Sequence, residues 1–395
     1  MKLSFENTDI AFAHKSNLGL QKAYWLFKAF GFPFIVNKGP KLANAALNLG
    51  LPIKGLIKST LFSQFCGGET IAESYPSAKQ LYKNRIGAIL DYSVEGEGTG
   101  EDFAKAFGEL QKVIIEATDK PEYPFAVFKC TGIGNFKMLM NVTNAMREVE
   151  NTTYRDDLDF QHFRSRFEAL CKLAYENNTK LFVDAEESWI QDAIDDIAYQ
   201  NMAVYNKEKA IVYNTIQLYR KDRISEMKYR IEEARIGEYK IGFKLVRGAY
   251  MEKEANRAVE FGYDNPIQNS KKDTDEDYDE AIRLCFECRD VVSFCAGTHN
   301  EKSSLFLAQL IDESDVAVND DRFWFAQLYG MSDNISYNLA AAGYNVAKYL
   351  PYGPIKGVLP YLSRRAQENS SVKGQASREL NLIQQEIKRR KLAKQ

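Results

Sequence analysis

The chain has 395 residues, of which 45% are hydrophobic and 27% charged, and its formal net charge is −2. This composition is typical of a globular protein with one large or two ordinary domains, and the near-neutral charge argues against a nucleic-acid partner. No run reaches the about 20 apolar residues that a membrane-spanning helix needs.

The N-terminal sequence MKLSFENTDIAF lacks the apolar core of a secretory signal. A mitochondrial leader is rich in arginine and poor in acids, whereas here Glu6 and Asp9 come early and Arg85 is the first arginine. We therefore expect a cytoplasmic protein of a bacterium-like cell. Residues 1–84 have helical patterning and form an expected N-terminal helical extension.

Eight β-rich runs, separated by helical segments, follow this extension. They are residues 85–93, 125–133, 180–188, 210–219, 239–250, 291–300, 321–331 and 346–353. Near-continuous apolar runs suit strands of a parallel sheet that are buried on both faces. Eight strands alternating with helices predict a (β/α)8 TIM-type barrel over 85–371, with a helical insertion at about 135–178. A doubly wound sheet is the rival fold, but no GxGxxG sequence opens a first helix.

Polar residues gather toward the C-terminal ends of these runs. They are Asp91, Lys129, Asp184, Gln217, Lys244, Arg247, His299, Gln327 and Tyr349. In a barrel these ends surround one mouth, which is where barrel enzymes hold their active site. The six cysteines show no paired framework and are expected to be free thiols; the lone CxxC at Cys285 and Cys288 is expected to face a helical core and hold no metal.

Beyond the last run, two adjacent arginines lie in the predicted helix that contains VLPYLSRRAQEN. Residues three and four apart share a helix face, so Tyr361, Arg364 and Glu368 are expected to line one surface with Arg365 on its flank. Two buried guanidiniums need an anion, and a planar carboxylate suits their geometry. A pair of surface arginines in salt bridges is the alternative.

These residues leave three kinds of function open. Several cations at a barrel mouth favour an anionic ligand or a phosphorylated cofactor, and Tyr250, Tyr349, Tyr352 and Tyr361 favour a ring-shaped ligand. A single lysine at a strand end could instead form a Schiff base, as in aldolases. A barrel that binds an anion without turnover is the third class.

Short motifs along the barrel resemble those of proline dehydrogenases. The longest is KLVRGAYMEKE (244–254), followed by DNPI (264–267). The others are GAILDYSVE (87–95), FKCTGIG (128–134), FVDAEES (182–188), AGTHN (296–300), FAQLYGMSDN (325–334) and YLPYG…YLSRRAQENSS (349–371). The resemblance covers about residues 65–371, in order, and is closest to the single-function, eukaryote-like branch.

The resemblance implies a distorted barrel with non-covalent FAD that oxidises L-proline to Δ1-pyrroline-5-carboxylate, the first step of proline catabolism to glutamate, and passes electrons to a membrane quinone. A separate dehydrogenase would then take the product. By resemblance, Arg364 and Arg365 bind the substrate carboxylate, and Asp184 orients an arginine. The remaining substrate-side residues that it implies are Lys129, Tyr250, Tyr349 and Tyr361.

The same resemblance implies cofactor contacts. The residues on the flavin side are Gln217, Lys244, Arg247, Gly248, Thr298, His299 and Gln327, with Glu368 grouped there as support for the arginines. One position departs from the family pattern, because many bacterial relatives have Arg where Lys244 stands. A lysine offers a compact charge and no planar fork, which puts the electrostatics near the flavin in question.

The C-terminal segment 372–395 is predicted to be a basic helical tail. Leu380, Ile383 and Ile387 recur at helical spacing, and the last residues are rich in Lys and Arg. Such a helix can lie on an anionic membrane surface, on the inner face of the cytoplasmic membrane. Packing of the helix on the barrel is the alternative, and the aromatic segment 24–36 is then the next candidate for a membrane contact.

Overall fold

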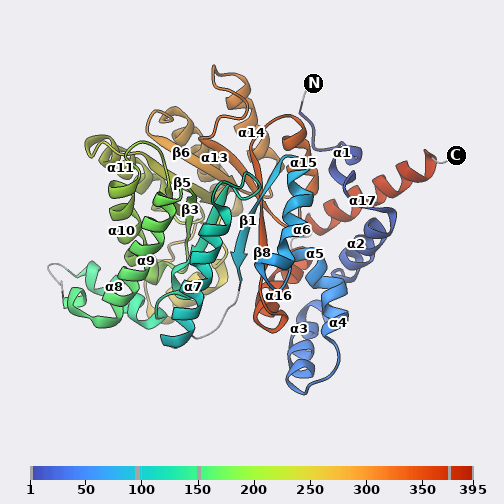
Figure 1. Cartoon of the computed structure of the whole chain (residues 1–395), viewed down its shortest axis with the longest axis horizontal. Helices are drawn as coiled ribbons and strands as arrows, with labels where there is room; N and C mark the ends of the chain where they lie inside the picture. The colour runs from blue at the N-terminus through green and yellow to red at the C-terminus, as the bar shows by residue number, and fades with distance from the viewer. Residues whose placement is uncertain (1–2, 94–97, 99, 149–152, 372–374, 394–395) are drawn as a thin grey trace. The chain divides into compact units, whose positions relative to one another are not determined.

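The computed structural model describes residues 3–93, 98, 100–148, 153–371 and 375–393. In these ranges eight strands follow one another around a closed parallel barrel, in the order β1 to β8 (Figure 1). The strands are β1 (Ile86–Tyr92), β2 (Phe125–Lys129), β3 (Lys180–Asp184), β4 (Val212–Gln217), β5 (Ile241–Val246), β6 (Val292–Gly297), β7 (Phe323–Leu328) and β8 (Val346–Tyr352). The predicted (β/α)8 barrel is confirmed, and the doubly wound alternative is wrong.

Helices precede β1 and separate the strands. Before β1 the chain forms α1 (Thr8–Phe12), α2 (Asn17–Ala29), α3 (Pro33–Asn48), α4 (Lys54–Ile57), a π-helical turn (Lys58–Phe62), α5 (Ser63–Phe65) and α6 (Ile71–Tyr82). After β1 it forms α7 (Gly100–Ala117), α8 (Phe136–Arg147), α9 (Leu158–Glu176), α10 (Ser188–Tyr205), α11 (Arg223–Ile236), α12 (Met251–Phe261), α13 (Lys271–Glu287), α14 (Glu301–Asp312), α15 (Asp333–Ala341), α16 (Ile355–Ser371) and α17 (Gln375–Leu392).

The chain divides into two compact units that do not follow the expected division. The first unit contains residues 1–96 and 326–395, and the second contains residues 97–325. The division into 1–84, 85–371 and 372–395 stays a prediction. In the second unit α8 and α9 occupy the predicted insertion between β2 and β3, apart from residues 149–152, which lie outside the described ranges.

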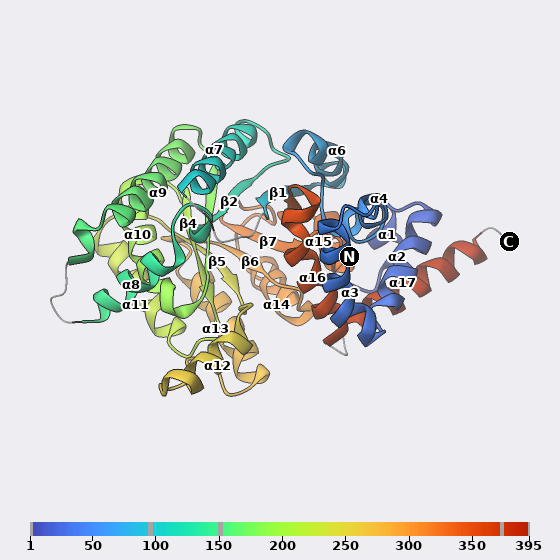
Figure 2. The same cartoon turned by 90° about the horizontal axis from the view of Figure 1, so that it is seen from below.

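Strand register in the second unit fixes which polar residues are neighbours. Lys129 of β2 is the register partner of Asp184 of β3. Lys244 of β5 is opposite Thr215 of β4 on one side and Cys295 of β6 on the other. Helices α8, α9 and α10 pack side by side beside these strands (Figures 1 and 2). The predicted strand-end residues therefore project from a sheet that buried helices hold in place.

The first unit has an aromatic core that joins both ends of the chain. Phe27, Phe30 and Phe65 form a cluster with ring centroids 5.8–6.4 Å apart. Tyr361 of α16 and Leu382 of α17 are buried in the same core. The helices before β1 and the helices after β8 thus bury one another's apolar faces, which is the main favourable term for holding them.

The C-terminal helix packs into this core, so the packing alternative is correct for the tail. Leu382 and Ile383 are buried, and Leu380 and Ile387 lie against the same cluster. Figure 1 shows α17 alongside α1 and α2. Leu380, Leu382, Ile383 and Ile387 are therefore covered by protein, while Leu392 is 61% exposed, which disfavours the expected membrane contact of the tail.

Most of the described arginines of α17 have protein partners as well. Arg390 donates to the Phe12 and Lys15 carbonyls at 2.7 Å and 2.8 Å. Arg389 pairs with Asp9 at 2.5 Å and with the buried Glu386 at 2.8 Å. These contacts fasten the last helix to the first one.

A buried carboxylate at the start of α15 collects three basic side chains. The Asp333 carboxylate lies 2.7 Å from the Lys348 ammonium, 3.3 Å from that of Lys15 and 3.5 Å from Nε2 of His14. The His14 ring also stacks on Tyr337, with centroids 4.1 Å apart. Burial acts to raise the pKa of Asp333, but the charges of Lys348 and Lys15 outweigh it and hold that pKa well below its usual range. The cluster therefore joins the turn after α1 to α15 and β8.

We predict that Glu379→Gln makes stability less dependent on pH. Glu379 of α17 accepts a hydrogen bond from the Ser332 backbone N–H, and burial raises its pKa to about 7. The unfolded value is about 4.3, so the folded state binds more protons and stability falls as pH rises from about 4.3 to 7. Gln keeps the acceptor oxygen without that charge.

Urea unfolding midpoints of both proteins at several pH values measure this effect. Relative to the native sequence, Glu379→Gln should gain stability between about pH 5 and 8, on the order of 1–3 kcal/mol. The exposed Glu252→Gln is the matched control. A difference that stays constant across this pH range would contradict the buried, charged state assigned to Glu379.

The described residues contain neither a membrane-spanning helix nor a cluster of metal ligands. None of the described helices combines the length and apolarity that crossing a membrane requires. Among the same residues, no group of three or more His, Cys, Asp or Glu side chains is arranged to hold a metal ion. Cys285 is buried on α13, as expected for a core position.

Candidate active site

Each of the nine predicted strand-end residues lies at or beyond the middle of its strand. The second unit contributes Lys129, Asp184, Gln217, Lys244, Arg247 and His299. The first unit contributes Asp91, Gln327 and Tyr349. Asp91 is buried, and its carboxylate accepts a hydrogen bond from Ser93 at 2.6 Å.

Helix α16 starts immediately after β8, at a turn that glycine and proline set. Gly353 has φ +143°, a conformation that favours glycine, and the carbonyl of Pro354 accepts hydrogen bonds from the backbone N–H groups of Gly357 and Val358. Val358 and Leu362 are fully buried in the core of the first unit. Their burial fixes the rotation of α16 and so the direction of its arginines.

Arg365, which we expected on the flank of this face, contacts both Tyr361 and Glu368. Its guanidinium lies 5.1 Å from the Tyr361 ring centroid, and Nη2 donates to Glu368 at 2.6 Å. Arg365 is 8% exposed, while Arg364 is half-buried. Spacings of three and of four residues both bring side chains to one helix face, so the expected face of Tyr361, Arg364 and Glu368 stays a prediction.

Two buried donors on this face lack a partner. Nε of Arg365 and the hydroxyl of Tyr361 are buried without a hydrogen bond within the described part of the chain. Burial raises the pKa of Tyr361 while the Arg365 charge lowers it, and the net result is a rise, so the phenol stays a neutral donor. Leaving buried donors unpaired is costly. A ligand with two carboxylate oxygens would satisfy both groups, so this face fits an organic anion.

Lysine and aspartate pair at the centre of the second unit. Lys244 is 5% exposed and forms an ion pair with Asp184. Its ammonium also lies 5.5 Å from the centroid of the Phe182 ring. The partner of Asp184 found here is thus a lysine, and the expected role of Asp184 in orienting an arginine stays a prediction.

Arg247 follows β5 and is held by three side chains. It donates to Asp275 at 2.6 Å, to the Thr298 hydroxyl at 2.7 Å and to the Ser303 hydroxyl at 3.0 Å. Its guanidinium lies 4.3 Å from the Tyr278 ring centroid. These contacts connect the end of β5 to α13 and to the start of α14, so Arg247 also sets the position of Thr298.

The other predicted cofactor residues lie at strand ends. Gln217 and Thr298 are buried, and His299 is half-buried before α14. Gly248 has φ +133°, and a Cβ there would come within 2.5 Å of the Tyr219 ring, so only glycine fits. Tyr250 follows at the N-cap position of α12.

The chemistry of these donors fits a flavin dinucleotide. Ammonium and guanidinium groups suit its phosphates, and hydroxyl, imidazole and amide groups suit its sugar and ring. In the first unit, Gln327 accepts a hydrogen bond from Ser336 at 2.8 Å and is buried. Glu368 instead contacts Arg365. Burial raises the pKa of Glu368, and this effect outweighs the charges of Arg365 and Arg364, which act to lower it.

Glu186 is a titratable group that the sequence interpretation missed. It is buried and accepts hydrogen bonds from the Thr131 backbone N–H at 2.9 Å and from the Thr131 hydroxyl at 2.5 Å. Burial raises the pKa of Glu186 to about 7, although these hydrogen bonds and the charge of Lys129 act to lower it. The signal was present in FVDAEES, where Asp184 ends the strand and Glu186 and Glu187 follow it.

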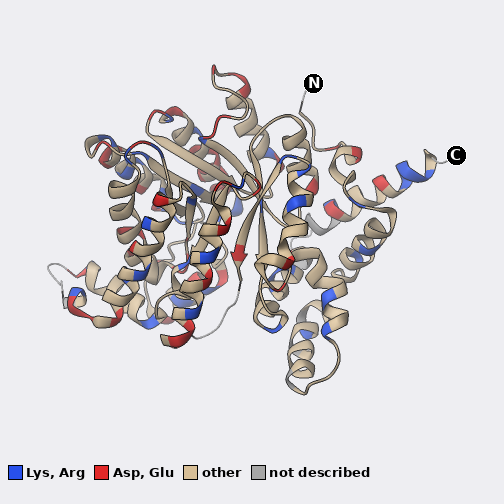
Figure 3. Ribbon diagram, viewed as in Figure 1, with Lys and Arg blue, Asp and Glu red and all other residues tan. Residues whose placement is uncertain are grey.

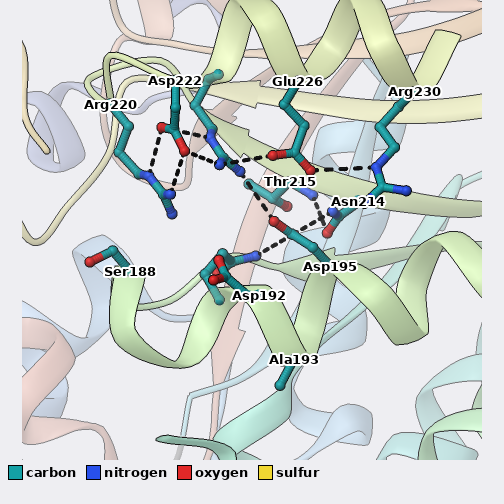
Figure 4. A network of polar contacts seen from close by, with 12 residues as sticks. Ser188, Asp192, Ala193, Asp195, Asn214, Thr215, Arg220, Asp222, Glu226 and Arg230 are labelled. Atoms are coloured by element: carbon teal, nitrogen blue, oxygen red, sulfur yellow. Dashed lines mark hydrogen bonds and ion pairs between the residues drawn. The ribbon is translucent and has the colours of Figure 1, made fainter. Parts of the chain in front are cut away.

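A second missed feature is the polar network behind β4 (Figure 4). Arg223 is 4% exposed and pairs with Asp195 at 3.1 Å, with Glu226 at 3.0 Å and with Asp222. Asp195 also accepts from the buried Asn214 of β4 at 2.7 Å. The network borders a cavity of about 430 Å³ and joins α10 and α11 to the strand that carries Gln217. Its cations and anions pair internally, so its role here is to position elements.

A sequence model of a protein family described as proline dehydrogenase matches residues 75–378. "Proline dehydrogenase 1, mitochondrial" of Dictyostelium discoideum is 30% identical, and the alignment covers 97% of this chain and 74% of that protein. "Hydroxyproline dehydrogenase" of Xenopus laevis is 27% identical over 98% of this chain and 90% of that protein.

Among solved structures, the fold is similar to that of proline utilization A (PutA) from Bdellovibrio bacteriovorus, with a TM-score of 0.71 and 18% sequence identity. The match covers 92% of this chain, and this chain spans 38% of that longer protein. At this identity the likeness supports the barrel fold alone.

Proposed function

Because this chain belongs to the proline dehydrogenase family, we propose that it oxidises L-proline to Δ1-pyrroline-5-carboxylate with non-covalent FAD and passes the electrons to a membrane quinone. Family membership supports the coarser statement that it is an oxidoreductase acting on proline. A separate dehydrogenase would then oxidise the product toward glutamate.

The observation that carries the proposal is the pair of unsatisfied donors on α16. Nε of Arg365 and the Tyr361 hydroxyl are buried without partners in the described chain, next to Arg364. The proline carboxylate supplies the two acceptor oxygens and the negative charge that this face needs. The Tyr361 ring and the Tyr349 ring, which is also largely buried, are apolar surfaces suited to the pyrrolidine ring.

The arginines also influence the amine of the substrate. Their positive charges disfavour a second cation nearby, so they favour loss of a proton from the proline nitrogen. A neutral nitrogen is needed, because its lone pair forms the double bond to the ring carbon. FAD, when bound, supplies the two-electron acceptor for the hydride that leaves that carbon. By family resemblance, Lys129, Asp184 and Tyr250 complete the substrate side.

Cofactor binding is assigned to the strand ends of the second unit and to Gln327. Lys244 and Arg247 offer positive charge, and Gln217, Thr298 and His299 offer hydrogen-bonding groups. By family resemblance, many bacterial relatives have an arginine at the position of Lys244. Here the ammonium of Lys244, which pairs with Asp184, offers a compact charge instead of a planar guanidinium. We propose that Asp184 holds this ammonium in place.

An absorbance spectrum of the purified protein tests the proposal. The expected result is a yellow protein whose flavin band bleaches when L-proline is added without oxygen. A colourless protein that borohydride traps on a lysine in the presence of substrate would instead support the Schiff-base alternative. A protein that binds proline with no bleaching and no turnover would support a binding barrel.

We predict that the enzyme prefers proline to 4-hydroxyproline. Tyr349 of β8 is 8% exposed and, by resemblance, stands where hydroxyproline-using relatives have a smaller residue. A buried aromatic there should crowd the ring hydroxyl and leave it unpaired, which disfavours it by about tenfold or more in kcat/KM.

Steady-state kinetics with both substrates measure this preference. Tyr349→Ser should reduce the ratio, whereas Tyr75→Ser, at an exposed position of α6, should leave it unchanged. Equal kcat/KM values for the two substrates in the native protein would show that Tyr349 does not set this specificity.

A further inference from the structure

Large apolar side chains are exposed along helices α2 to α4. Those that are half or more exposed are Leu18 (72%), Trp25 (61%), Phe32 (56%), Phe34 (70%), Leu42 (58%), Leu49 (79%), Leu51 (50%) and Leu56 (65%). Exposed apolar residues scattered singly are normal, but eight within forty residues are a concentration. We call this set the N-terminal apolar surface.

These residues lie on or beside helices whose described buried residues belong to the core of the first unit. On α2, Leu18 and Trp25 are seven residues apart and so share one face, opposite the buried Leu20 and Phe27. On α3 the exposed Phe34 lies opposite the buried Val36, which belongs to the aromatic core. The N-terminal apolar surface is therefore an addition to a completed core and not a missing part of it.

The part of the sequence that carries this surface contains lysines but no acidic residues. No Asp or Glu occurs between Asp9 and Glu69, and the lysines in that interval number seven. Of these, Lys22, Lys28, Lys38 and Lys54 are exposed and form no ion pair with a residue that the structure describes. Figure 3 shows blue and no red along α2 to α4.

Tryptophan and lysine meet within this surface. The Lys28 ammonium lies 4.9 Å from the Trp25 ring centroid. An amphipathic aromatic ring beside a cation suits the level of lipid headgroups, where phosphates and the first acyl carbons are both within reach. Helix α17 differs, because Leu380, Leu382, Ile383 and Ile387 pack into the core and only Leu392 is largely exposed among its described large apolar residues. Arg389 and Arg390 of the same helix contact protein groups.

We propose that the N-terminal apolar surface, with Lys22, Lys28, Lys38 and Lys54, binds an anionic lipid bilayer. Charge selects this occupant: a second copy of the chain would set lysine against lysine, whereas anionic headgroups neutralise them. Apolar side chains between the lysines enter the headgroup boundary, which a nucleic acid does not offer. The proposal rests on the proposed function for its purpose, since a lipid-soluble quinone must be reached at a bilayer.

Co-sedimentation of the full-length holoenzyme with vesicles tests the proposal. The vesicles are phosphatidylcholine alone or phosphatidylcholine mixed with phosphatidylglycerol, at low and at high salt. We expect binding to the anionic vesicles that weakens in high salt, together with a blue shift of tryptophan fluorescence. Binding that ignores lipid charge would overturn the assignment.

Two variants test the apolar residues and the lysines of the surface separately. One is Trp25→Ser with Phe34→Ser, and the other combines Lys22→Gln, Lys28→Gln, Lys38→Gln and Lys54→Gln. Each should lower the vesicle partition coefficient about tenfold or more, because basic and buried apolar residues contribute separately. All six positions are exposed, so thermal unfolding should not change.

Control variants carry changes of the same kind elsewhere, with two lysines replaced instead of four. Lys388→Gln with Lys391→Gln alters exposed lysines of α17, and Ile236→Ser with Val259→Ser alters side chains that are 77% and 85% exposed. These should bind vesicles like the native protein. If the surface variants also bind like it, or if they change only the oligomeric state in lipid-free solution, the proposal is wrong.

Activity with a soluble dye as electron acceptor separates this proposal from the function. If the protein oxidises proline normally with the dye but does not bind vesicles, the proposed membrane surface is wrong and the proposed function is still supported. If the protein binds vesicles but does not oxidise proline, the proposed function is wrong and the membrane surface is still supported. Loss of quinone-dependent activity in the surface variants, with dye activity retained, is the result expected if both are correct.

Discussion

Arg365→Met should raise KM for L-proline strongly while leaving flavin content unchanged. Arg365 is 8% exposed and has an unsatisfied Nε, so its charge is desolvated and available to a carboxylate. Removing one partner of a desolvated charge pair costs about 2–5 kcal/mol, which corresponds to roughly 30- to several-thousand-fold in kcat/KM. Steady-state kinetics and the flavin absorbance of the same preparation measure both quantities. Arg364→Met should behave similarly.

An exposed arginine that also pairs with a glutamate three residues away on its helix is the control. Arg283 of α13 donates to Glu280 three residues away at 2.7 Å, as Arg365 does to Glu368, but its side chain is 49% exposed. Arg283→Met should leave KM unchanged. A native KM in Arg365→Met would refute the assignment of α16 to the substrate carboxylate.

Lys348→Met should destabilise the fold by about 3–5 kcal/mol at neutral pH, because breaking a buried ion pair leaves a charge uncompensated. Lys348 is 0% exposed and donates to Asp333 at 2.7 Å and to the Met331 carbonyl at 2.6 Å. Lys15 and His14 would then remain as the basic groups beside Asp333. Urea unfolding measures the loss.

The sign of the pH dependence follows from the depressed pKa of Asp333. The stabilisation is fully present above the unfolded pKa of about 3.9 and is lost as pH falls through the folded value. Lys112→Met is the control, since Lys112 pairs with Glu109 at 3.0 Å with its side chain 69% exposed, and it should cost under about 1 kcal/mol. Equal losses in the two variants would mean that the Asp333 cluster contributes no more than a surface pair.

The barrel was predictable because its signals are local. Each strand is a short, nearly continuous apolar run, and a strand buried on both faces needs that pattern wherever its neighbours lie. The chain order of those runs also placed polar residues such as Lys129 and Asp184 at strand ends. The adjacent Arg364 and Arg365, after an apolar stretch, also predicted an anion site, and this site stays a prediction. Family resemblance then added roles for individual residues, which the experiments above test.

Contacts between distant segments were not predictable. The spacing of Leu380, Ile383 and Ile387 shows an apolar helix face, and that pattern is the same whether the face meets lipid or protein. Only the fold shows that α1 and α2 cover it, which leaves the outward residues of α2 to α4 as the exposed set. Likewise Lys244 pairs with Asp184, sixty residues away in the sequence, because strand register brings β3 and β5 beside β4.

The sequence by itself determined the barrel and the family, because these depend on short patterns that hold in any surroundings. The tertiary structure decided that Arg365 lies over the Tyr361 ring, that Glu186 is buried beside Thr131, and that the tail packs into the core. The physical reason is that burial, and with it the pKa of an acid or the availability of an apolar face, depends on which distant elements pack against a residue.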